Sequence, residues 1–382
     1  MFNLKPKLSS SETTIFTRMS ALATEYGAVN LGQGFPDFDP PADLLDHVRQ
    51  SASGHTHQYA PMPGLLRLRE AIARKAGALY NIDLDPHTDV TITAGATQAL
   101  FTAIMTLVHP GDEVIIFEPA YDSYRPSVEL AGGRTVVYRM QPPDFRINWQ
   151  MVAGLVTGKT RMIIINSPHN PTGKVLAKAD LESLSSLVRN TEILVLSDEV
   201  YEHLVYDGHC HESVLRYPEL FARSIAVFSF GKTYHCTGWK IGYLVAPVWL
   251  TAEIRKVHQW NVFSVNSVLQ HALAEYTDNS HHYHALAGFY QAKRDLFRQM
   301  LAGTGFRLLA CEGTFFQLCS YDDISQSDDD QFTLELVRKH KVAAIPLSAF
   351  YSEPGGVRLV RFCFAKKEET LLLAGDRLRS VV

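Results

Sequence analysis

The chain has 382 residues, carries a formal net charge of −4 at pH 7 and is 46% hydrophobic, so it can bury the cores of two domains. It has no long basic run, which argues against nucleic acid as a partner, and no apolar run long enough to span a membrane. Its five cysteines form no CxxC pair. The cysteines are therefore predicted to be reduced thiols. The start of the chain is polar, contains proline and does not resemble a signal peptide, so we expect a cytoplasmic protein.

The beginning of the chain predicts an arm. Residues 1–28 contain one amphipathic helix over 13–25, with Ser11 and Glu12 as its expected start. Glycine and proline then interrupt the pattern around Gln33. Glycines on both sides of Gln33 would let a ligand approach the backbone closely, although a turn-rich connector explains the same residues.

Residues 55–64 form a second irregular stretch, and a helix is predicted over 65–79. The stretch contains a His-x-His pair, His55 and His57. No third ligand is evident nearby, so we expect no metal site.

From residue 89 onward, short apolar runs alternate with helical patterns, as in a largely parallel sheet covered by helices on both faces. Strands are expected at residues 90–93, 113–117, 161–165, 193–198, 224–228 and 241–245. We therefore predict an α/β fold with a large domain over 29–277. We also predict a smaller α+β domain over 278–382, with a long helix over 283–301. The N-terminal arm is expected to pack with this smaller domain.

A turn of small residues, 94–98, leads into a helix expected over 99–108. Such a turn offers backbone N–H groups and the positive end of the helix dipole to an anion. Ala96 and Thr97 are therefore candidate phosphate ligands, although the pattern is weak by itself.

Three polar residues stand at or in apolar strands. Asp198 and Tyr201 follow the strand that starts at residue 193 and are spaced to reach one ligand, although a strand-end acid often caps a helix. Arg361 interrupts the apolar strand 359–364. A buried guanidinium needs an anionic partner, which is either an internal carboxylate or a ligand.

Lys232 is the strongest candidate for a reactive residue. It follows the strand 224–228, and its sequence neighbours include four aromatic residues, Phe228, Phe230, Tyr234 and Trp239. Desolvation by such rings lowers the pKa of a lysine and makes its amine a nucleophile toward carbonyls. Ser229 and Lys240 are natural phosphate partners, so the segment predicts an imine with pyridoxal phosphate.

A nucleotide-binding protein is the alternative from a different class. Residues 226–233 also satisfy the loose pattern [AG]-x4-GK-[ST]. A phosphate-wrapping loop needs flexible glycines, however, and Val-Phe-Ser-Phe is stiff and bulky. This interpretation is therefore disfavoured.

Two segments carry a family resemblance. The pattern Ser-x-Gly-Lys-Thr-x-x-x-Thr-Gly-Trp-Lys-x-Gly over 229–242 resembles the lysine segment of fold type I, or aspartate-aminotransferase-fold, pyridoxal-phosphate enzymes. It is most similar to the methionine aminotransferase and kynurenine–glutamine transaminase subgroup. Asn-Ser-Pro-His-Asn-Pro-Thr-Gly over 166–173 resembles the family's Asn-Pro-x-Asn-Pro-Thr-Gly, with Ser167 inserted.

The resemblance implies a homodimer with shared active sites and assigns roles to individual residues. It implies that Lys232 holds the cofactor and that Tyr121 stacks on the ring. The other cofactor contacts it implies are Asp198 at the ring nitrogen, Asn170 and Tyr201 at the phenolic oxygen, and Ala96, Thr97, Ser229 and Lys240 at the phosphate. Tyr59 would reach the phosphate from the other subunit. For the substrate, it implies Arg361, Gly34 and Asn170 at the α-carboxylate.

Substrate choice depends on the rest of the pocket. The early loops show no further arginine for a second carboxylate, and an apolar pocket is suggested by Phe16, Phe35, Tyr59, Tyr121 and Phe263. We expect ping-pong transfer from methionine, aromatic amino acids or glutamine to a 2-oxo acid. Ser264 stands where the kynurenine enzymes place His after this Phe. A carbon–sulfur β-lyase acting on cysteine conjugates is the alternative within the family.

Overall fold

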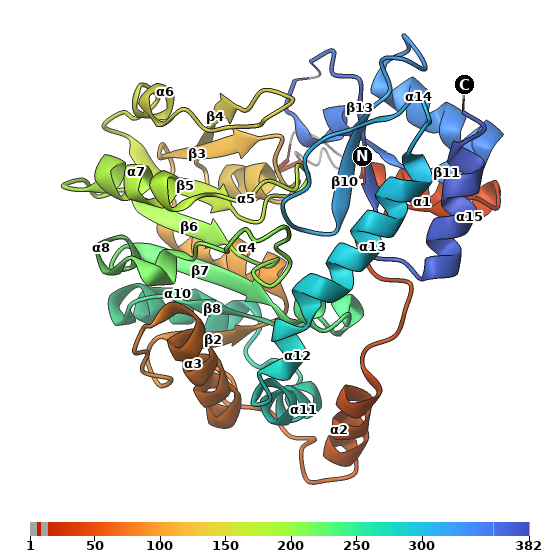
Figure 1. Ribbon diagram of the computed structural model, residues 1–382. Helices are drawn as coiled ribbons and strands as arrows, with labels where there is room; N and C mark the ends of the chain where they lie inside the picture. Colours follow the sequence, from red (N-terminus) through yellow and green to blue (C-terminus); the bar gives the residue numbers. More distant parts are fainter. Residues whose placement is uncertain (1–5, 9–13, 354, 382) are drawn as a thin grey trace, which may run out of the picture.

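The computed structural model describes residues 6–8, 14–353 and 355–381. Its centre is a seven-stranded sheet in the order β2-β8-β7-β6-β5-β3-β4 (Figure 1). The strands are β2 (Val90–Thr93), β3 (Glu113–Glu118), β4 (Arg134–Arg139), β5 (Thr160–Asn166), β6 (Leu194–Asp198), β7 (Ser224–Ser229) and β8 (Gly242–Val245). Within the described residues, β8 pairs antiparallel with both β2 and β7, and the other neighbouring strands pair in parallel.

Alternate residues of these strands enter two different cores, as the pleat of a sheet buried on both faces requires. Val114 and Ile116 pack in one core and Ile115 packs in the other. The first face is covered by α4 (Ala96–Leu107), α5 (Tyr124–Leu130) and α10 (Val248–Asn261). The second is covered by α3 (Leu66–Tyr80), α6 (Trp149–Ala153), α7 (Lys178–Val188), α8 (Pro218–Phe221) and α11 (Ser267–Thr277). The sheet is therefore shielded from water on both sides.

The last part of the chain adds an antiparallel sheet in the order β12-β13-β10-β9. Its strands are β9 (Arg307–Leu308), β10 (Phe316–Ser320), β12 (Ile345–Pro346) and β13 (Leu359–Cys363). The accompanying helices are α12 (His281–His284), α13 (Leu286–Leu301), α14 (Asp329–Glu335) and α15 (Glu368–Leu378). Figure 1 shows α13 running from the large sheet toward this smaller part.

The N-terminal elements pack against both parts. The helix α1 (Ile15–Glu25) precedes β1 (Val29–Asn30), which pairs in parallel with β11 (Val342–Ala343) of the smaller part. The next helix, α2 (Ala42–Ala52), lies beside α11 (Figure 1). The division at 28/29 and 277/278 stays a prediction, but β1 is paired with the C-terminal part of the chain.

The order and type of the predicted elements agree with the structure, while several boundaries differ. The helix expected over 99–108 begins at Ala96, so Ala96 and Thr97 lie in its first turn. Lys232, expected in a turn, belongs to the short helix α9 (Phe230–Thr233). Helix α1 is capped by the Thr14 hydroxyl, and the expected start at 11–13 lies outside the described residues.

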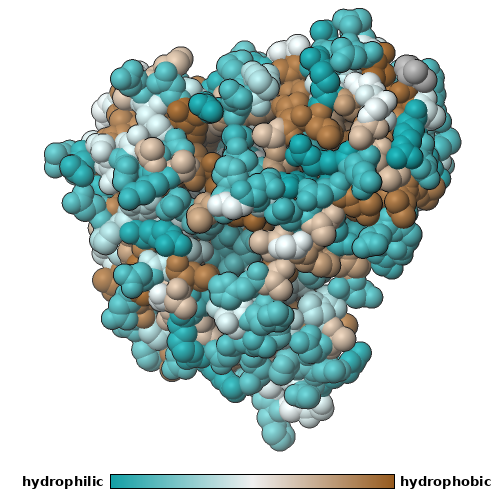
Figure 2. Space-filling model, in the orientation of Figure 1, coloured by the Kyte–Doolittle hydropathy of each residue, from teal (hydrophilic) through white to brown (hydrophobic). Residues whose placement is uncertain are grey.

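The face of the molecule in Figure 2 is mostly hydrophilic, with hydrophobic residues in separate small groups. Among the described residues, no helix combines the length and hydropathy needed to cross a bilayer.

Candidate active site

A cavity of about 320 Å³ lies where the carboxyl ends of β5, β6 and β7 meet the smaller part of the chain. The carboxyl ends of parallel strands meet at one edge of a sheet, which is where α/β proteins bind ligands. The predicted site residues that line it are Phe16, Gly34, Ala96, Thr97, Tyr121, Asn170, Asp198, Tyr201, Ser229, Lys232, Lys240 and Arg361. Tyr59 and Phe263 are absent from this lining.

Lys232 projects into this cavity from α9. Its Nζ donates a hydrogen bond to the Gly34 carbonyl oxygen at 3.1 Å. The amine lies 5.3 Å from the ring centroid of Phe315 and 5.7 Å from that of Tyr201. Burial, helped by the positive charges of Arg361 and Lys240, lowers the pKa of Lys232 to about 8. An amine with this pKa is partly neutral near physiological pH and can act as nucleophile or base.

The rings that desolvate Lys232 are not the ones expected from its sequence neighbours. Phe228 stacks on Tyr243, with centroids 4.9 Å apart, and Phe230 packs on Tyr234, so these rings belong to the core. Phe228 on β7, Phe230 at the start of α9 and Tyr234 after it pack into the core beneath the sheet instead of around the amine. The prediction of a lysine with a lowered pKa is therefore confirmed for a different reason.

Asp198 ends β6 and is 4% exposed. Its Oδ2 accepts a 2.6 Å hydrogen bond from the Tyr124 hydroxyl, and its Oδ1 accepts one from the Val200 backbone N–H at 3.4 Å. Burial raises the pKa of this carboxyl to about 6, although the Tyr124 hydrogen bond opposes the shift. A buried carboxylate in this state favours a cationic partner, such as a protonated ring nitrogen.

Tyr124 was missed by the sequence reasoning. It stands at the start of α5, three residues after Tyr121, and this helical spacing was the available signal. Burial, followed by the neighbouring Asp198 charge, raises its pKa well above the usual value. The hydroxyl therefore stays protonated and keeps donating to Asp198.

Arg361 is buried on β13, with 1% of its surface exposed. Its guanidinium donates to Asn170 Oδ1 at 2.8 Å and to the Gly32 carbonyl oxygen at 2.9 Å. No carboxylate within the described ranges forms a salt bridge with it, so the alternative of an internal ion pair is wrong. Its Nε is buried without a hydrogen-bond partner. A buried, incompletely paired cation of this kind fits an anionic ligand.

Aromatic rings surround the Arg361 guanidinium. The guanidinium carbon lies 3.8 Å from the ring centroid of Phe316, 4.9 Å from Phe350 and 5.3 Å from Phe16. These rings come from three distant parts of the chain. They make the surroundings of the guanidinium largely apolar.

The other end of the cavity can hold an anion. Ala96 and Thr97 occupy the first turn of α4, after Gly95, whose φ of +78° suits glycine. A Cβ added to Gly95 would lie 3.4 Å from Lys240 Nζ, so Lys240 reaches this turn. Backbone N–H groups, a helix N-terminus and a lysine together form an environment for phosphate. Gly95 was missed, although its place before the helix was a usable signal.

Asn166 links the carboxyl ends of β5 and β6. Its amide donates to the Asp198 carbonyl oxygen at 2.8 Å and its Oδ1 accepts from the Asn170 N–H at 2.8 Å. Asn170, in turn, contacts Arg361. This chain of hydrogen bonds fixes Asn170 between the two ends of the cavity.

Tyr59 and Phe263 lie outside this cavity and contact each other. Tyr59 is 80% exposed and Phe263 is 48% exposed, with their ring centroids 5.1 Å apart in an edge-to-face arrangement. Ser264 donates from its hydroxyl to the Ala60 carbonyl oxygen at 2.9 Å, which joins the two loops. Within one subunit, neither ring reaches the residues around Lys232.

The donor set suits pyridoxal phosphate. The cavity combines a partly neutral amine, a buried carboxylate, an amide and an anion-binding helix turn, which match the aldehyde, ring nitrogen, phenolic oxygen and phosphate of this cofactor. The nucleotide-loop alternative does not fit, because residues 226–229 of its pattern lie in the strand β7 and residues 230–233 in the short helix α9, so the segment forms no loop.

Comparisons with known proteins give the family. Residues 26–378 match the aminotransferase class I and II family. The chain is 50% identical to methionine aminotransferase from Escherichia coli, over 98% of this chain and 97% of that protein. It is 34% identical to human kynurenine–oxoglutarate transaminase 1, over 94% of this chain and 93% of that protein.

A solved structure gives the same result. The structure of an Escherichia coli methionine aminotransferase superposes with a TM-score of 0.97 at 49% identity, covering 99% of this chain and 100% of that one. The fold is therefore that of the pyridoxal-phosphate transferases, as predicted. The chain belongs to the aminotransferase class I and II family and is a pyridoxal-phosphate-dependent aminotransferase.

Proposed function

We propose that this aminotransferase takes its amino group from methionine, an aromatic amino acid or glutamine and passes it to a 2-oxo acid. The observation that carries the proposal is the enclosure of Arg361 by Phe16, Phe316 and Phe350. Phe16 and Phe316 also line the cavity, so an apolar side chain would pack on them while its α-carboxylate binds the guanidinium. The name of the Escherichia coli relative points to methionine.

The charges of the cavity support the same substrate class. Within the described residues, its cationic side chains are Lys232, Lys240 and Arg361. If Lys240 holds the phosphate and Lys232 holds the cofactor, Arg361 alone remains for carboxylates. A substrate with a second carboxylate would then have no cation at its distal end.

Bound pyridoxal phosphate supplies an electron sink for the electrons left when the substrate loses its α-proton. Lys232 would hold the cofactor and, with its amine free, would act as base toward that proton and then as acid. Asp198 would keep the ring nitrogen protonated. Asn170 and Tyr201 would hold the phenolic oxygen, and Gly34 would lie beside the carboxylate bound by Arg361.

The remaining roles belong to the same proposal. Tyr121 stacks on the cofactor ring, and the helix turn at Ala96 and Thr97 binds phosphate with Ser229 and Lys240. The enzyme works as a cytoplasmic homodimer by a ping-pong mechanism. The exposed pair formed by Tyr59 and Phe263 enters the active site of the other subunit.

A panel of amino donors, each paired with several 2-oxo acids, tests the substrate class. We expect the highest kcat/KM with methionine, phenylalanine or glutamine and at least a hundredfold lower value with aspartate. A preference for aspartate or glutamate would contradict the proposal. Steady pyruvate release from a cysteine conjugate without any oxo acid would instead favour the β-lyase.

Two variants test the central roles. Lys232→Ala should abolish turnover, and retained transamination would remove Lys232 from the mechanism. Arg361→Lys should mainly raise KM, because an ammonium cannot bind a carboxylate with two parallel hydrogen bonds. An unchanged kcat/KM would show that Arg361 does not bind the α-carboxylate.

A further inference from the structure

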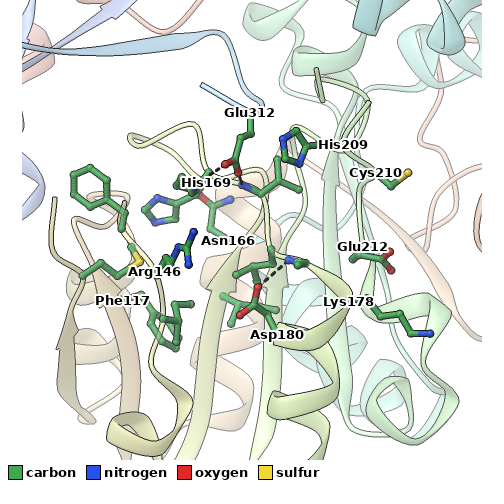
Figure 3. Close-up of a pocket in the computed structure, with 18 residues that line it drawn as sticks. Phe117, Arg146, Asn166, His169, Lys178, Asp180, His209, Cys210, Glu212 and Glu312 are labelled. Atoms are coloured by element: carbon green, nitrogen blue, oxygen red, sulfur yellow. Dashed lines mark hydrogen bonds and ion pairs between the residues drawn. The ribbon is translucent and has the colours of Figure 1, made fainter. Parts of the chain in front are cut away.

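A second cavity, of about 520 Å³, lies beside the candidate active site (Figure 3). The two cavities have only Asn166 in common. The second is formed by the end of β3, the segment after β4, the loop 169–178, the segment 209–212 and Glu312. None of the roles proposed above uses its interior.

One wall of the second cavity is apolar and buried. It includes Phe117, Met140 and Ile165, which are 6%, 4% and 2% exposed, together with the half-buried Leu176. These side chains already belong to the core beneath the sheet. A ligand with an apolar body can therefore be desolvated here without rearrangement of the core.

The acids of this cavity are already bonded within the protein. Glu312 pairs with Lys174 and accepts from the Val175 N–H at 3.0 Å. Asp180 accepts from Trp149 Nε1 at 2.9 Å and from the Ala177 N–H at 2.8 Å. Glu212 accepts from the Tyr217 hydroxyl at 2.8 Å.

Arg146 has a different environment. Figure 3 shows its guanidinium on the same side of the cavity as His169 and Asn166. In the part of the chain that the structure describes, it makes no ion pair and no side-chain hydrogen bond. A guanidinium presented to a cavity in this way is available to an anion.

His169 supplies a second polar group, and it is 7% exposed. Its Nδ1 lies 2.8 Å from the Thr172 hydroxyl oxygen. That oxygen accepts from the Lys174 N–H, so its own proton is available for Nδ1. Burial lowers the pKa of His169 to about 3, so the ring is neutral. With the Thr172 hydroxyl donating to Nδ1, the single ring proton lies on Nε2.

The Nε2–H of His169 faces the cavity. This atom has no hydrogen-bond partner among the described residues, and part of its surface remains accessible to solvent. Because His169 lines the cavity and is otherwise enclosed, the exposed part of the ring opens into this space. A buried donor and an available guanidinium therefore face the same volume.

We propose that this second cavity binds a hydrophobic monocarboxylate. The carboxylate accepts from the Arg146 guanidinium and from His169 Nε2–H. The apolar body lies against Phe117, Met140 and Leu176. Of the other cations that line the cavity, Lys174 pairs with Glu312 and Lys178 pairs with Glu182. Arg146 and the neutral His169 donor therefore match a single negative charge, whereas a dianionic phosphate would face the nearby Glu312 and Asp180 charges with too few donors.

The test uses the holoenzyme with 13C-methyl-labelled methionine and 3-phenylpropionate, which carries neither an amino nor an oxo group. Met140 lines the second cavity, and no methionine lines the candidate active site. Its methyl resonance, assigned with Met140→Leu, therefore reports on this cavity alone. We expect a saturable shift of that resonance.

Variants distinguish binding in the second cavity from binding in the candidate active site. Arg146→Ala should weaken the binding seen at Met140 at least fivefold, and Arg361→Leu should leave it within twofold. Arg338→Ala removes an exposed arginine that lines neither cavity, and it should also leave the binding within twofold. An unshifted Met140, or equal binding by Arg146→Ala and the unaltered enzyme, would overturn the proposal.

Two further probes test the ligand chemistry. The uncharged 3-phenylpropanamide should bind at least fivefold more weakly than 3-phenylpropionate, because it lacks the charge for Arg146. Inorganic phosphate should shift Met140 only at much higher concentration. If the amide or phosphate bound as tightly as 3-phenylpropionate, the assignment to a hydrophobic monocarboxylate would be wrong.

Discussion

Lys232 and Asp198 are the titratable groups at the centre of the candidate active site, and burial shifts both pKa values toward neutrality. The amine has a pKa of about 8 and the carboxyl a pKa of about 6. Each shift favours the uncharged form, as expected for groups removed from water. The cofactor-free protein therefore holds two groups whose charge states change close to physiological pH.

Asp198→Asn should stabilise the cofactor-free protein at pH 7. The carboxyl is protonated below about pH 6 in the folded state and below 3.8 in the unfolded state. Folding therefore takes up a proton between these values, and the wild-type free energy of unfolding falls as pH rises through that window. This reduction in the wild-type free energy of unfolding persists above pH 6 and amounts to about 3 kcal/mol at most.

Chemical denaturation of the cofactor-free proteins at pH 4, 5, 6 and 7 measures this difference. The two proteins should have similar stability at pH 4 and diverge toward pH 6. Parallel stability curves would show that Asp198 does not titrate in this window. With cofactor bound the order should reverse, because the variant loses the charge that faces the ring nitrogen.

The rate at which the cofactor-free enzyme captures pyridoxal phosphate should depend on the ionisation of Lys232. Only the neutral amine attacks an aldehyde, so the rate should rise about tenfold per pH unit below pH 8 and level off above it. Stopped-flow absorbance measures the profile. Arg361→Leu should move the midpoint to higher pH, because the Arg361 charge lowers the Lys232 pKa; a midpoint near 10 in the unaltered enzyme would contradict the burial argument.

Tyr124→Phe should lower kcat/KM about tenfold while the protein stays folded. The change removes a 2.6 Å hydrogen bond to Asp198, and hydrogen bonds to charged groups contribute about 1.5–3 kcal/mol. Since that bond lowers the Asp198 pKa, its loss leaves the carboxylate less ionised. Tyr138→Phe is the control, because Tyr138 bonds the Asn148 N–H away from the cavity; equal effects of both changes would deny Tyr124 a specific role.

At the scale of elements, β8 and the start of α4 must approach closely to form the phosphate end of the cavity. A Cβ added to Gly242 would lie 2.7 Å from the Phe228 carbonyl oxygen and 2.8 Å from the Ala96 N–H nitrogen. Both are backbone atoms, which cannot move aside as a flexible side chain would. Glycine at position 242 therefore allows the strand to lie against the helix turn.

Gly242→Ala should destabilise the holoenzyme by about 1–3 kcal/mol, the usual cost of overpacking, and weaken cofactor binding. Gly238→Ala is a matched control in the same segment, because its Cβ would meet nothing within 4 Å. Thermal unfolding and cofactor titration measure both effects. Equal behaviour of the two variants would show that the approach of β8 to α4 does not control the site.

At the scale of the whole molecule, Tyr59 and Phe263 are exposed and pack against each other. Large aromatic side chains exposed together often mark an interaction surface. The proposed homodimer would bury the pair and complete each active site with residues from the other chain.

Subunit exchange between Lys232→Ala and Tyr59→Ala enzymes tests this arrangement. In the heterodimer, one site receives both defects and the other combines an intact Lys232 with an intact Tyr59. Activity at limiting pyridoxal phosphate should therefore exceed the summed activities of the two parent enzymes. No gain after verified exchange would mean that Tyr59 does not act across subunits.

The sequence by itself determined the order of strands and helices and three polar site residues: Asp198 at the end of a strand, Lys232 soon after one and Arg361 within one. Apolar runs specify buried strands, and parallel strands bring their carboxyl ends to one edge whatever the details of packing. This is why residues far apart in the chain could be expected at one cavity.

Only the tertiary structure decided which groups surround those residues. The rings beside Lys232 are Tyr201 and Phe315 rather than its sequence neighbours, and Tyr124 holds Asp198. The second cavity likewise depends on Arg146 and His169 lining one space from separate segments. Side-chain contacts between distant segments depend on how the layers pack, and local spacing along a chain carries no record of that packing.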